Sequence, residues 1–304
     1  MLHIIKPGAL TTIQDLGRTG FAHLGVSPAG AADSVSFRIA NLLVGNDMNA
    51  PALEATLLCP TIEFEVAATI AISGSRNPSV PMNEALEVAA GQRLAIGPLL
   101  DGARAYIAIR GGIAIPEVML SCSTFIPATM GGYKGRALKA GDTLEIDKRV
   151  RGSCRKLSAN SLDRFCPPSR GPLRVTSSLQ QDWFDEETIK RFHHQVFKVS
   201  DDSNRSGLRL AGDPIFPQKR QELLTEGIAL GAVQVTPEGQ PIILFVDQQT
   251  TGGYPKIANV IAADLARVGQ LRPRDEVTFR AVSVPEAIEL LRQQEKLLAE
   301  AFAI

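Results

Sequence analysis

The stretch GAVQVTPEGQPIILFVDQQTTGGYPKIANVIAADLARVG, residues 231–269, holds the densest local order in the chain. Residues 231–235 and 242–246 are apolar, β-branched runs of strand length, and Pro237 and Gly239 lie in the segment between them. Proline at the second position and glycine at the fourth are typical of a type I β-turn. The spacing therefore predicts a β-hairpin.

A polar loop and an expected helix follow the hairpin. Residues 247–254 read DQQTTGGY, and Pro255 then opens a segment whose apolar positions 257, 260, 261, 265 and 268 keep helical spacing up to Gly269. We therefore expect a helix that begins at Pro255. Its free N–H groups would favour a carboxylate or phosphate beside the loop. The alternative is that Thr250 or Thr251 only caps that helix.

Several segments resemble one known family. Residues 231–270 resemble the C-terminal signature of the allophanate hydrolase subunit 2 family, which includes KipA and the C-type subunit of 5-oxoprolinase and is related to the carboxyltransferase part of urea carboxylase. Further similarity lies in PGALTTIQDLGRTGFAHLGVSPAGAADSVSFRIANLLVGN at 7–46, GARAYIAIRGGIAIPEV at 102–118, SNRSGLRLAGD at 203–213 and LLTEGIALGAVQV at 223–235. Together these segments extend the resemblance from about residue 1 to about residue 290.

The expected fold is mainly β. From residue 61 to residue 144 the chain is a series of short apolar runs separated by glycine, proline or asparagine, which favours an antiparallel barrel or sandwich. The resemblance narrows this to two cyclophilin-like β-barrel domains with a few helices. We expect an N-terminal β-rich domain at 1–150, a basic linker with prolines at 151–170, and a barrel-like domain with a C-terminal helix at 171–304.

Composition excludes several classes of partner. Lys+Arg and Asp+Glu are both 32, so the formal net charge is zero. The sequence contains no basic segment interspersed with aromatic residues, the pattern that would indicate nucleic-acid binding. No apolar run approaches the ~18 residues of a membrane span. The start MLHIIKPGAL lacks the features of a secretory signal, and the four cysteines have no zinc-type spacing. We expect a cytoplasmic protein with reduced thiols and no metal site.

The resemblance implies a component of ATP-dependent 5-oxoprolinase. Such an enzyme opens the lactam of 5-oxo-L-proline to L-glutamate, and its other components would be an A-type subunit, together with a B-type subunit (KipI or allophanate hydrolase subunit 1). The resemblance implies ATP as well, bound by this chain or with one of those partners. The sequence contains no Gly-x-x-x-x-Gly-Lys-Ser/Thr loop. Two alternatives stay open: a KipA-type protein that antagonises a kinase inhibitor, and a carboxyltransferase component supplied with biotin from another chain.

The candidate site residues follow from the matched segments. Asp33 and Asp247 are the acidic candidates for catalysis, although Asp33 is also placed to cap a helix from about residue 34 to residue 44. Arg205 and Arg209 are the basic residues expected near an acidic ligand; a surface pair is the alternative. The remaining candidates for substrate binding are Gln248, Thr250, Thr251, Gly252, Gly253 and Tyr254.

Overall fold

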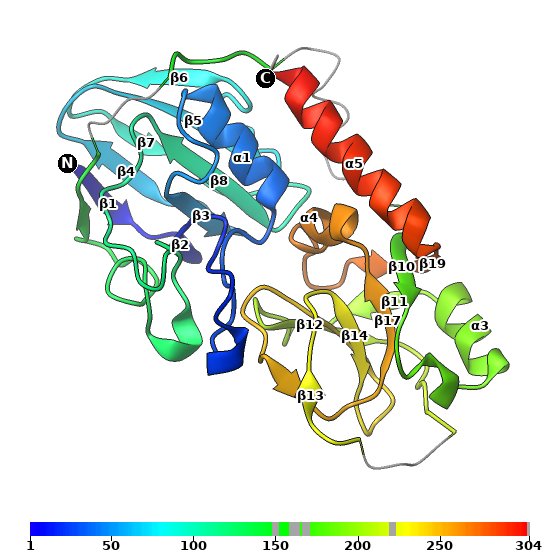
Figure 1. Ribbon diagram of the computed structural model, residues 1–304. Coiled ribbons are helices and arrows are strands. Elements are labelled where there is room, and N and C mark those ends of the chain that lie inside the picture. The colour runs from blue at the N-terminus through cyan, green and yellow to red at the C-terminus, as the bar shows by residue number, and fades with distance from the viewer. Residues whose placement is uncertain (148–151, 158–164, 166–170, 219–222, 303–304) are drawn as a thin grey trace. The chain divides into compact units, whose positions relative to one another are not determined.

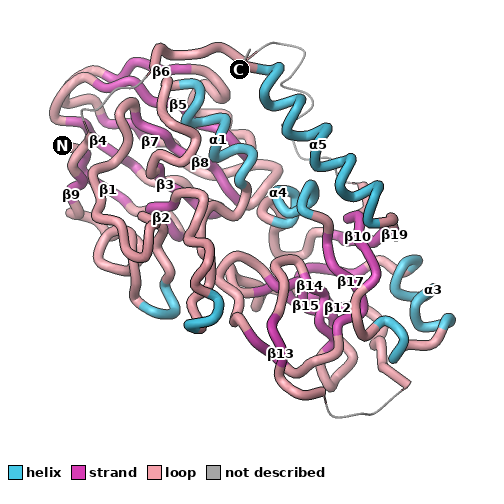
Figure 2. The backbone as a smooth tube through the Cα atoms, viewed as in Figure 1, coloured by secondary structure: helices cyan, strands magenta, loops and turns pink. Residues whose placement is uncertain are grey.

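A computed structural model describes residues 1–147, 152–157, 165, 171–218 and 223–302. The chain divides into two compact units. Unit 1 comprises residues 1–18, 29–168 and 297–304, and unit 2 comprises residues 19–28 and 169–296. The expected linker at 151–170 lies mostly outside the described residues, so the expected domain boundaries stay a prediction. Strands predominate in both units (Figure 2), which confirms the mainly β fold.

Unit 1 is built from two antiparallel sheets. One has the order β7-β4-β1-β9 and the other the order β2-β3-β8-β5-β6. Helix α1 lies across β5 and β8 (Figure 1). The elements are β1 (Leu2–Lys6), β2 (Leu10–Gln14), α1 (Ser34–Leu43), β3 (Ala52–Thr56), β4 (Thr61–Phe64), β5 (Ala68–Gly74), β6 (Ala85–Val88), β7 (Arg93–Ala95), β8 (Arg104–Ile109), η2 (Ile126–Ala128) and β9 (Thr143–Leu144). The apolar residues of both sheets meet in one buried core.

Unit 2 is built on an eight-stranded sheet that forms a nearly closed barrel. Its strand order is β18-β11-β12-β15-β14-β17-β10-β19, and β13 and β16 form a separate pair. The elements are η1 (Ala22–Leu24), β10 (Leu173–Ser177), η3 (Gln181–Trp183), α3 (Glu186–His194), β11 (Phe197–Val199), β12 (Gly207–Ala211), β13 (Glu226–Gly227), β14 (Ala232–Val235), β15 (Pro241–Leu244), β16 (Thr251–Gly252), β17 (Lys256–Val260), η4 (Ala262–Asp264), α4 (Leu265–Val268), β18 (Glu276–Val277) and β19 (Phe279–Ala281). Helix α5 spans Val284–Ala301.

The predicted hairpin is confirmed. Strands β14 and β15 pair antiparallel with Val235 opposite Pro241. The Gly239 N–H donates to the Thr236 carbonyl oxygen at 2.9 Å, which closes the expected type I turn. Gly239 has a φ of 80°, a conformation that glycine adopts without the steric cost a side chain would bring.

The helix expected from Pro255 is wrong over its first half. Residues 256–260 form β17, which pairs with β14 on one side and β10 on the other. The helical turns begin only at η4. Two neighbouring strands supply hydrogen-bond partners along both edges of this segment, and Ile257, Ala258 and Val260 are buried there. Tertiary pairing therefore overrides a spacing that also fits a helix.

Because residues 256–260 form β17, the helix start expected at Pro255 is wrong, and the anion site loses the helix N-terminus on which it partly rested. Ligand binding by the 250–254 loop itself stays a prediction. Thr250 and Thr251 are not helix caps. No helix among the described residues is long and apolar enough to cross a membrane.

Candidate functional site

The start of β17 carries a buried charge. Lys256 and Gln234 are opposite each other in the β14–β17 pair, where the register shifts between Val233 and Gln234. Lys256 and Gln234 are 5% and 2% exposed, and the next two residues of β17 are buried as well. Strand residues normally alternate between the two faces of a sheet, and a bulge interrupts this alternation. The irregular register between β14 and β17 therefore lies at Lys256, whose side chain is enclosed within unit 2.

Two polar side chains of unit 2 donate to one carboxylate oxygen of a third, Glu226. Lys256 Nζ donates to Glu226 Oε1 in a short ion pair. Gln180 Nε2 donates to the same oxygen at 2.9 Å. The Lys256 side chain is 6% exposed, whereas that of Glu226 is 36% exposed. The hydrogen bond from Lys256 holds the pKa of the Glu226 carboxyl below its usual range.

Two buried glutamine oxygens near this ion pair have no hydrogen-bond partner among the described residues. They are Gln180 Oε1 and Gln248 Oε1, in side chains that are 6% and 4% exposed. Gln248 is tied into the same region, since its Nε2 donates to the Ile228 carbonyl oxygen at 3.2 Å. A buried acceptor without a donor costs about 1–3 kcal/mol. Such atoms therefore indicate a place where a ligand with N–H or O–H groups could bind.

The polar loop packs closely against this cluster. Strand β16 pairs with β13, so that Gly252 lies opposite Glu226 and Thr251 opposite Gly227. A Cβ atom at Gly252 would lie 2.6 Å from Ile228 Cδ1 and 3.1 Å from Gln234 Nε2. A side chain at 252 would therefore require the ends of the Ile228 and Gln234 side chains to shift.

Arg205 and Asp247 bind each other. Arg205 Nε donates to Asp247 Oδ2 at 2.9 Å, and Arg205 Nη2 donates to Asp247 Oδ1 at 3.1 Å. Both side chains are buried, at 6% and 3% exposure. This bidentate geometry fixes the start of the polar loop to the segment before β12.

The other predicted residues have different surroundings. Thr251 is exposed, and Tyr254 is 45% exposed. Thr250 is half-buried, and its carbonyl oxygen accepts from the Ile228 N–H at 3.0 Å, while Gly253 is half-buried too. Arg209 is exposed on β12, away from the alternate buried positions 208 and 210.

Asp33 lies in unit 1 and caps α1 as predicted. Its Oδ1 accepts from the N–H groups of Val35 at 3.1 Å and Ser36 at 2.9 Å. Its Oδ2 accepts from Ser36 Oγ at 2.6 Å. The Asp33 N–H donates to the hydroxyl of Tyr106 at 2.7 Å. The carboxylate thus has a defined structural role at the helix N-terminus.

The sequence pattern did not single out Lys256, Glu226, Gln180 or Gln234. One signal was available: Lys256 is a single cation at the head of an apolar run, KIANV. Glu226 and Gln180 are 46 residues apart in the chain, and only the folded structure joins them.

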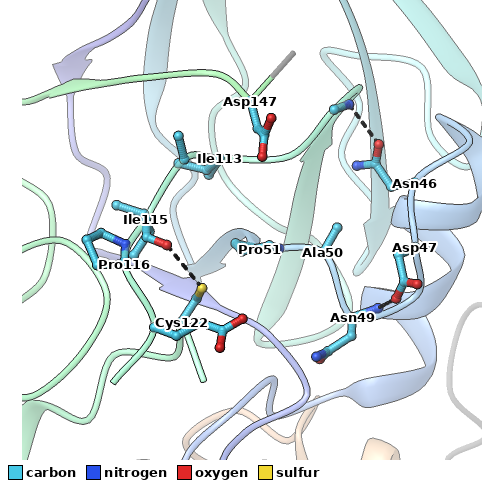
Figure 3. A pocket seen from close by; sticks show the side chains of 13 residues that line it. Asn46, Asp47, Asn49, Ala50, Pro51, Ile113, Ile115, Pro116, Cys122 and Asp147 are labelled. Carbon is cyan, nitrogen blue, oxygen red and sulfur yellow. Dashed lines mark hydrogen bonds between the residues drawn. The ribbon is translucent and has the colours of Figure 1, made fainter. Parts of the chain in front are cut away.

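Unit 1 contains a separate pocket of about 560 Å³ (Figure 3). Asp47, Glu117 and Asp147 contribute carboxylates to its lining, and Ile113 is among its apolar residues. Cys122 donates to the Ile115 carbonyl oxygen at the pocket wall. Burial raises the pKa of the Cys122 thiol to about 11. None of the predicted site residues lines this pocket, and within the described ranges no group of three His, Cys, Asp or Glu side chains could hold a metal ion.

Comparison with known proteins gives consistent matches. The chain is 40% identical to the C subunit of 5-oxoprolinase from Escherichia coli over 302 residues, which are 97% of this chain and 96% of that protein. It is 36% identical to urea amidolyase of Lachancea kluyveri, covering 96% of this chain but 17% of that protein. The solved structure of the K. lactis urea amidolyase matches with a TM-score of 0.91 and 34% identity, over 98% of this chain and 20% of that one.

The chain thus corresponds to nearly all of the first relative and to about a fifth of the urea amidolyases. A family model described as "Carboxyltransferase domain, subdomain A and B" matches residues 24–281, which is most of the chain. The chain belongs to this carboxyltransferase-domain family.

Proposed function

We propose that the chain is one component of an ATP-dependent 5-oxoprolinase that cleaves 5-oxo-L-proline to L-glutamate with partner subunits. The observation that carries the proposal is the match to the C subunit of 5-oxoprolinase at 40% identity, which extends over 97% of this chain and 96% of the relative. A second relative with the same name, from Haemophilus influenzae, is 35% identical over similar shares. Both matches support a correspondence between this chain and a 5-oxoprolinase C subunit over nearly the full length of each.

The proposed reaction has several distinct chemical steps, which explains why several subunits would contribute to it. A lactam carbonyl is a weak electrophile, so the proposed reaction first transfers the γ-phosphoryl group of ATP to the lactam oxygen and releases ADP. Water then adds to the activated carbon, and the C–N bond breaks as the ring nitrogen takes a proton. A second water releases phosphate from the resulting acyl phosphate. Each step needs hydrogen-bond donors that are already placed where negative charge develops.

The polar cluster of unit 2 supports a substrate-binding role for this chain. It combines an enclosed cation, Lys256, with two buried amide oxygens, Gln180 Oε1 and Gln248 Oε1, that no described residue satisfies. Lactams carry both N–H and C=O groups, which suit such a mixture of donors and acceptors. We place ATP with or on a partner chain, since the sequence has no P-loop motif.

Reconstitution tests this proposal. The purified chain should be inert with ATP and 5-oxoproline, because it would supply only part of the machinery. Addition of the A-type and B-type partner proteins should give glutamate and ADP in equal amounts. Full turnover by this chain alone would refute the division of labour, and no turnover by the complete mixture would refute the proposed function.

Carboxyl transfer is the second candidate, favoured by the family model and by the 0.91 TM-score to the K. lactis urea amidolyase. It would require carboxybiotin from another chain. Incubation with a carboxylated biotin-carrier domain and urea distinguishes the two: transfer of labelled carboxyl to urea supports this candidate, whereas glutamate formation supports the first.

A further inference from the structure

The ion pair between Lys256 and Glu226 is asymmetric in its burial. Lys256 is enclosed on a central strand, while Glu226 is 36% exposed on the two-residue strand β13. The hydrogen bond described for Lys256 Nζ goes to this one carboxylate. A buried ammonium group needs a compensating anion, but nothing requires that this anion belong to the protein.

Gln180 completes the surroundings of the same carboxylate oxygen. Its Nε2 and Lys256 Nζ both donate to Glu226 Oε1, so two donors define one carboxylate-oxygen position. The other atom of the same amide group, Gln180 Oε1, is a buried acceptor without a described partner. The site therefore presents donors for a carboxylate and, directly beside them, an acceptor for an N–H group.

We propose that Lys256 and Gln180 form the binding site for an α-amido carboxylate, and that Glu226 occupies the carboxylate position until the ligand displaces it. In such a ligand the N–H and the carboxylate are attached to the same carbon atom, which matches the adjacent acceptor and donor of the Gln180 amide. The ligand carboxylate takes the place of Glu226 on Lys256, and the ligand N–H donates to Gln180 Oε1. Glu226 then moves into solvent.

Charge compensation makes this site selective for ligands that carry a carboxylate. Exchange of one carboxylate for another keeps the buried ammonium group paired throughout. A neutral amide such as urea could displace Glu226 only by leaving Lys256 without an anion, which is costly. This inference rests on the proposed function, because it takes the ligand of the chain to be an amide-type substrate. Between the two candidate substrates, the site favours the lactam acid over urea.

Three probes separate the parts of the proposal: 5-oxo-L-proline, 2-pyrrolidinone, which lacks the carboxylate, and 5-oxotetrahydrofuran-2-carboxylate, which has a ring oxygen in place of the N–H. Binding to the full chain is measured by saturation-transfer NMR titration. For the wild type we expect 5-oxoproline to bind most tightly and 2-pyrrolidinone least. Absence of 5-oxoproline binding at millimolar concentrations would overturn the proposal.

The variant Glu226→Gln removes the competing carboxylate. It should tighten both acid probes by about fivefold, on the scale of a partly exposed ion pair, and 2-pyrrolidinone should remain weaker than either acid because it supplies no carboxylate to Lys256. Glu186→Gln is the matched control, since Glu186 pairs with Lys190 on the exposed surface of α3, and it should change nothing. Unchanged or weaker binding of 5-oxoproline to Glu226→Gln would contradict the placeholder role.

Three further variants test the ligand contacts. Gln180→Met should bring 5-oxoproline to the affinity of the lactone acid, because the N–H acceptor is gone. Lys256→Met should remove the preference for acids, and Lys256→Arg keeps the cation in case the methionine variant does not fold. A persistent N–H preference in Gln180→Met would refute the proposed pairing.

Turnover of the reconstituted complex keeps this inference distinct from the proposed function. Tighter acid binding by Glu226→Gln without any turnover would leave the site standing and refute the 5-oxoprolinase role. Turnover with no effect of Glu226→Gln on acid binding would refute the site alone.

Discussion

Arg205 and Asp247 form a bidentate ion pair in which the two N–O distances are 2.9 and 3.1 Å and both side chains are almost fully buried. Asp247→Ala removes the carboxylate that accepts from both Arg205 Nε and Arg205 Nη2. We expect a loss of about 3–5 kcal/mol in the free energy of unfolding, measured by urea denaturation. The double variant Arg205→Met, Asp247→Leu should lose clearly less. A double-variant loss equal to the sum of the losses in Asp247→Leu and Arg205→Met, each measured alone, would show that the two residues are not energetically coupled.

Asp33 provides a test that separates capping from catalysis. Asp33→Ala removes the acceptor for the N–H groups of Val35 and Ser36 and should cost about 1–2 kcal/mol of stability. Asp33→Asn retains an acceptor oxygen and should cost less. Thermal melts should be recorded beside turnover of the reconstituted complex. An Asp33→Asn protein of normal stability without turnover would favour the catalytic role expected from the sequence.

Thr251 is exposed on β16 and caps no helix. Thr251→Val should therefore change stability by less than about 0.5 kcal/mol. Its neighbour serves as the comparison: Gly252→Ala places a Cβ atom 2.6 Å from Ile228 Cδ1, so the end of that side chain must shift, and the variant should lose more stability than Thr251→Val, by up to about 1 kcal/mol. Differential scanning calorimetry of both variants measures the contrast. A large loss in Thr251→Val would reveal a structural role for its hydroxyl.

Cysteine reactivity should follow burial. Burial raises the pKa of Cys59 to about 12 and that of Cys122 to about 11, whereas Cys154 is exposed. At pH 8 only about one Cys122 thiol in a thousand is ionised, and the thiolate is the reactive form. In a Cys166→Ser background, iodoacetamide should modify Cys154 well before the other two, as peptide mass spectrometry will show. Equal labelling rates would contradict the enclosure of Cys59 and Cys122.

Acid stability of unit 1 should depend on Arg136 and Asp142. Arg136 donates to both Asp142 oxygens, at 2.7 and 2.9 Å, and this lowers the pKa of the Asp142 carboxyl. A carboxyl with a lowered folded-state pKa stabilises the protein above its unfolded pKa of about 3.9, and this contribution is lost as the pH falls through the folded value. Arg136→Met should therefore lower the free energy of unfolding relative to wild type at neutral pH. In acid, where Asp142 is protonated in both proteins, the difference in unfolding free energy between the variant and wild type should become smaller. Lys190→Met, which disrupts only an exposed pair, should show no such pH dependence.

The sequence by itself determined those features whose hydrogen bonds join residues only a few positions apart in the chain. Pro237 and Gly239 specify the turn of the β14–β15 hairpin, and Asp33 specifies the start of α1, since a cap bonds to N–H groups two and three residues ahead. Ser283 caps α5 in the same way, through a hydrogen bond from the Glu286 N–H at 3.2 Å. The repeated short apolar runs likewise determined a mainly β chain.

Tertiary structure alone decided the state of residues 255–260 and the composition of the candidate site. The spacing of Ile257 and Val260 suits a helix or an enclosed strand, and pairing with both β10 and β14 selects the strand. That choice buries Lys256 and places Glu226 and Gln180 on it, although the three residues are far apart in the chain. A local pattern cannot encode such a convergence, because the partners of a buried charge are determined by which strands become neighbours.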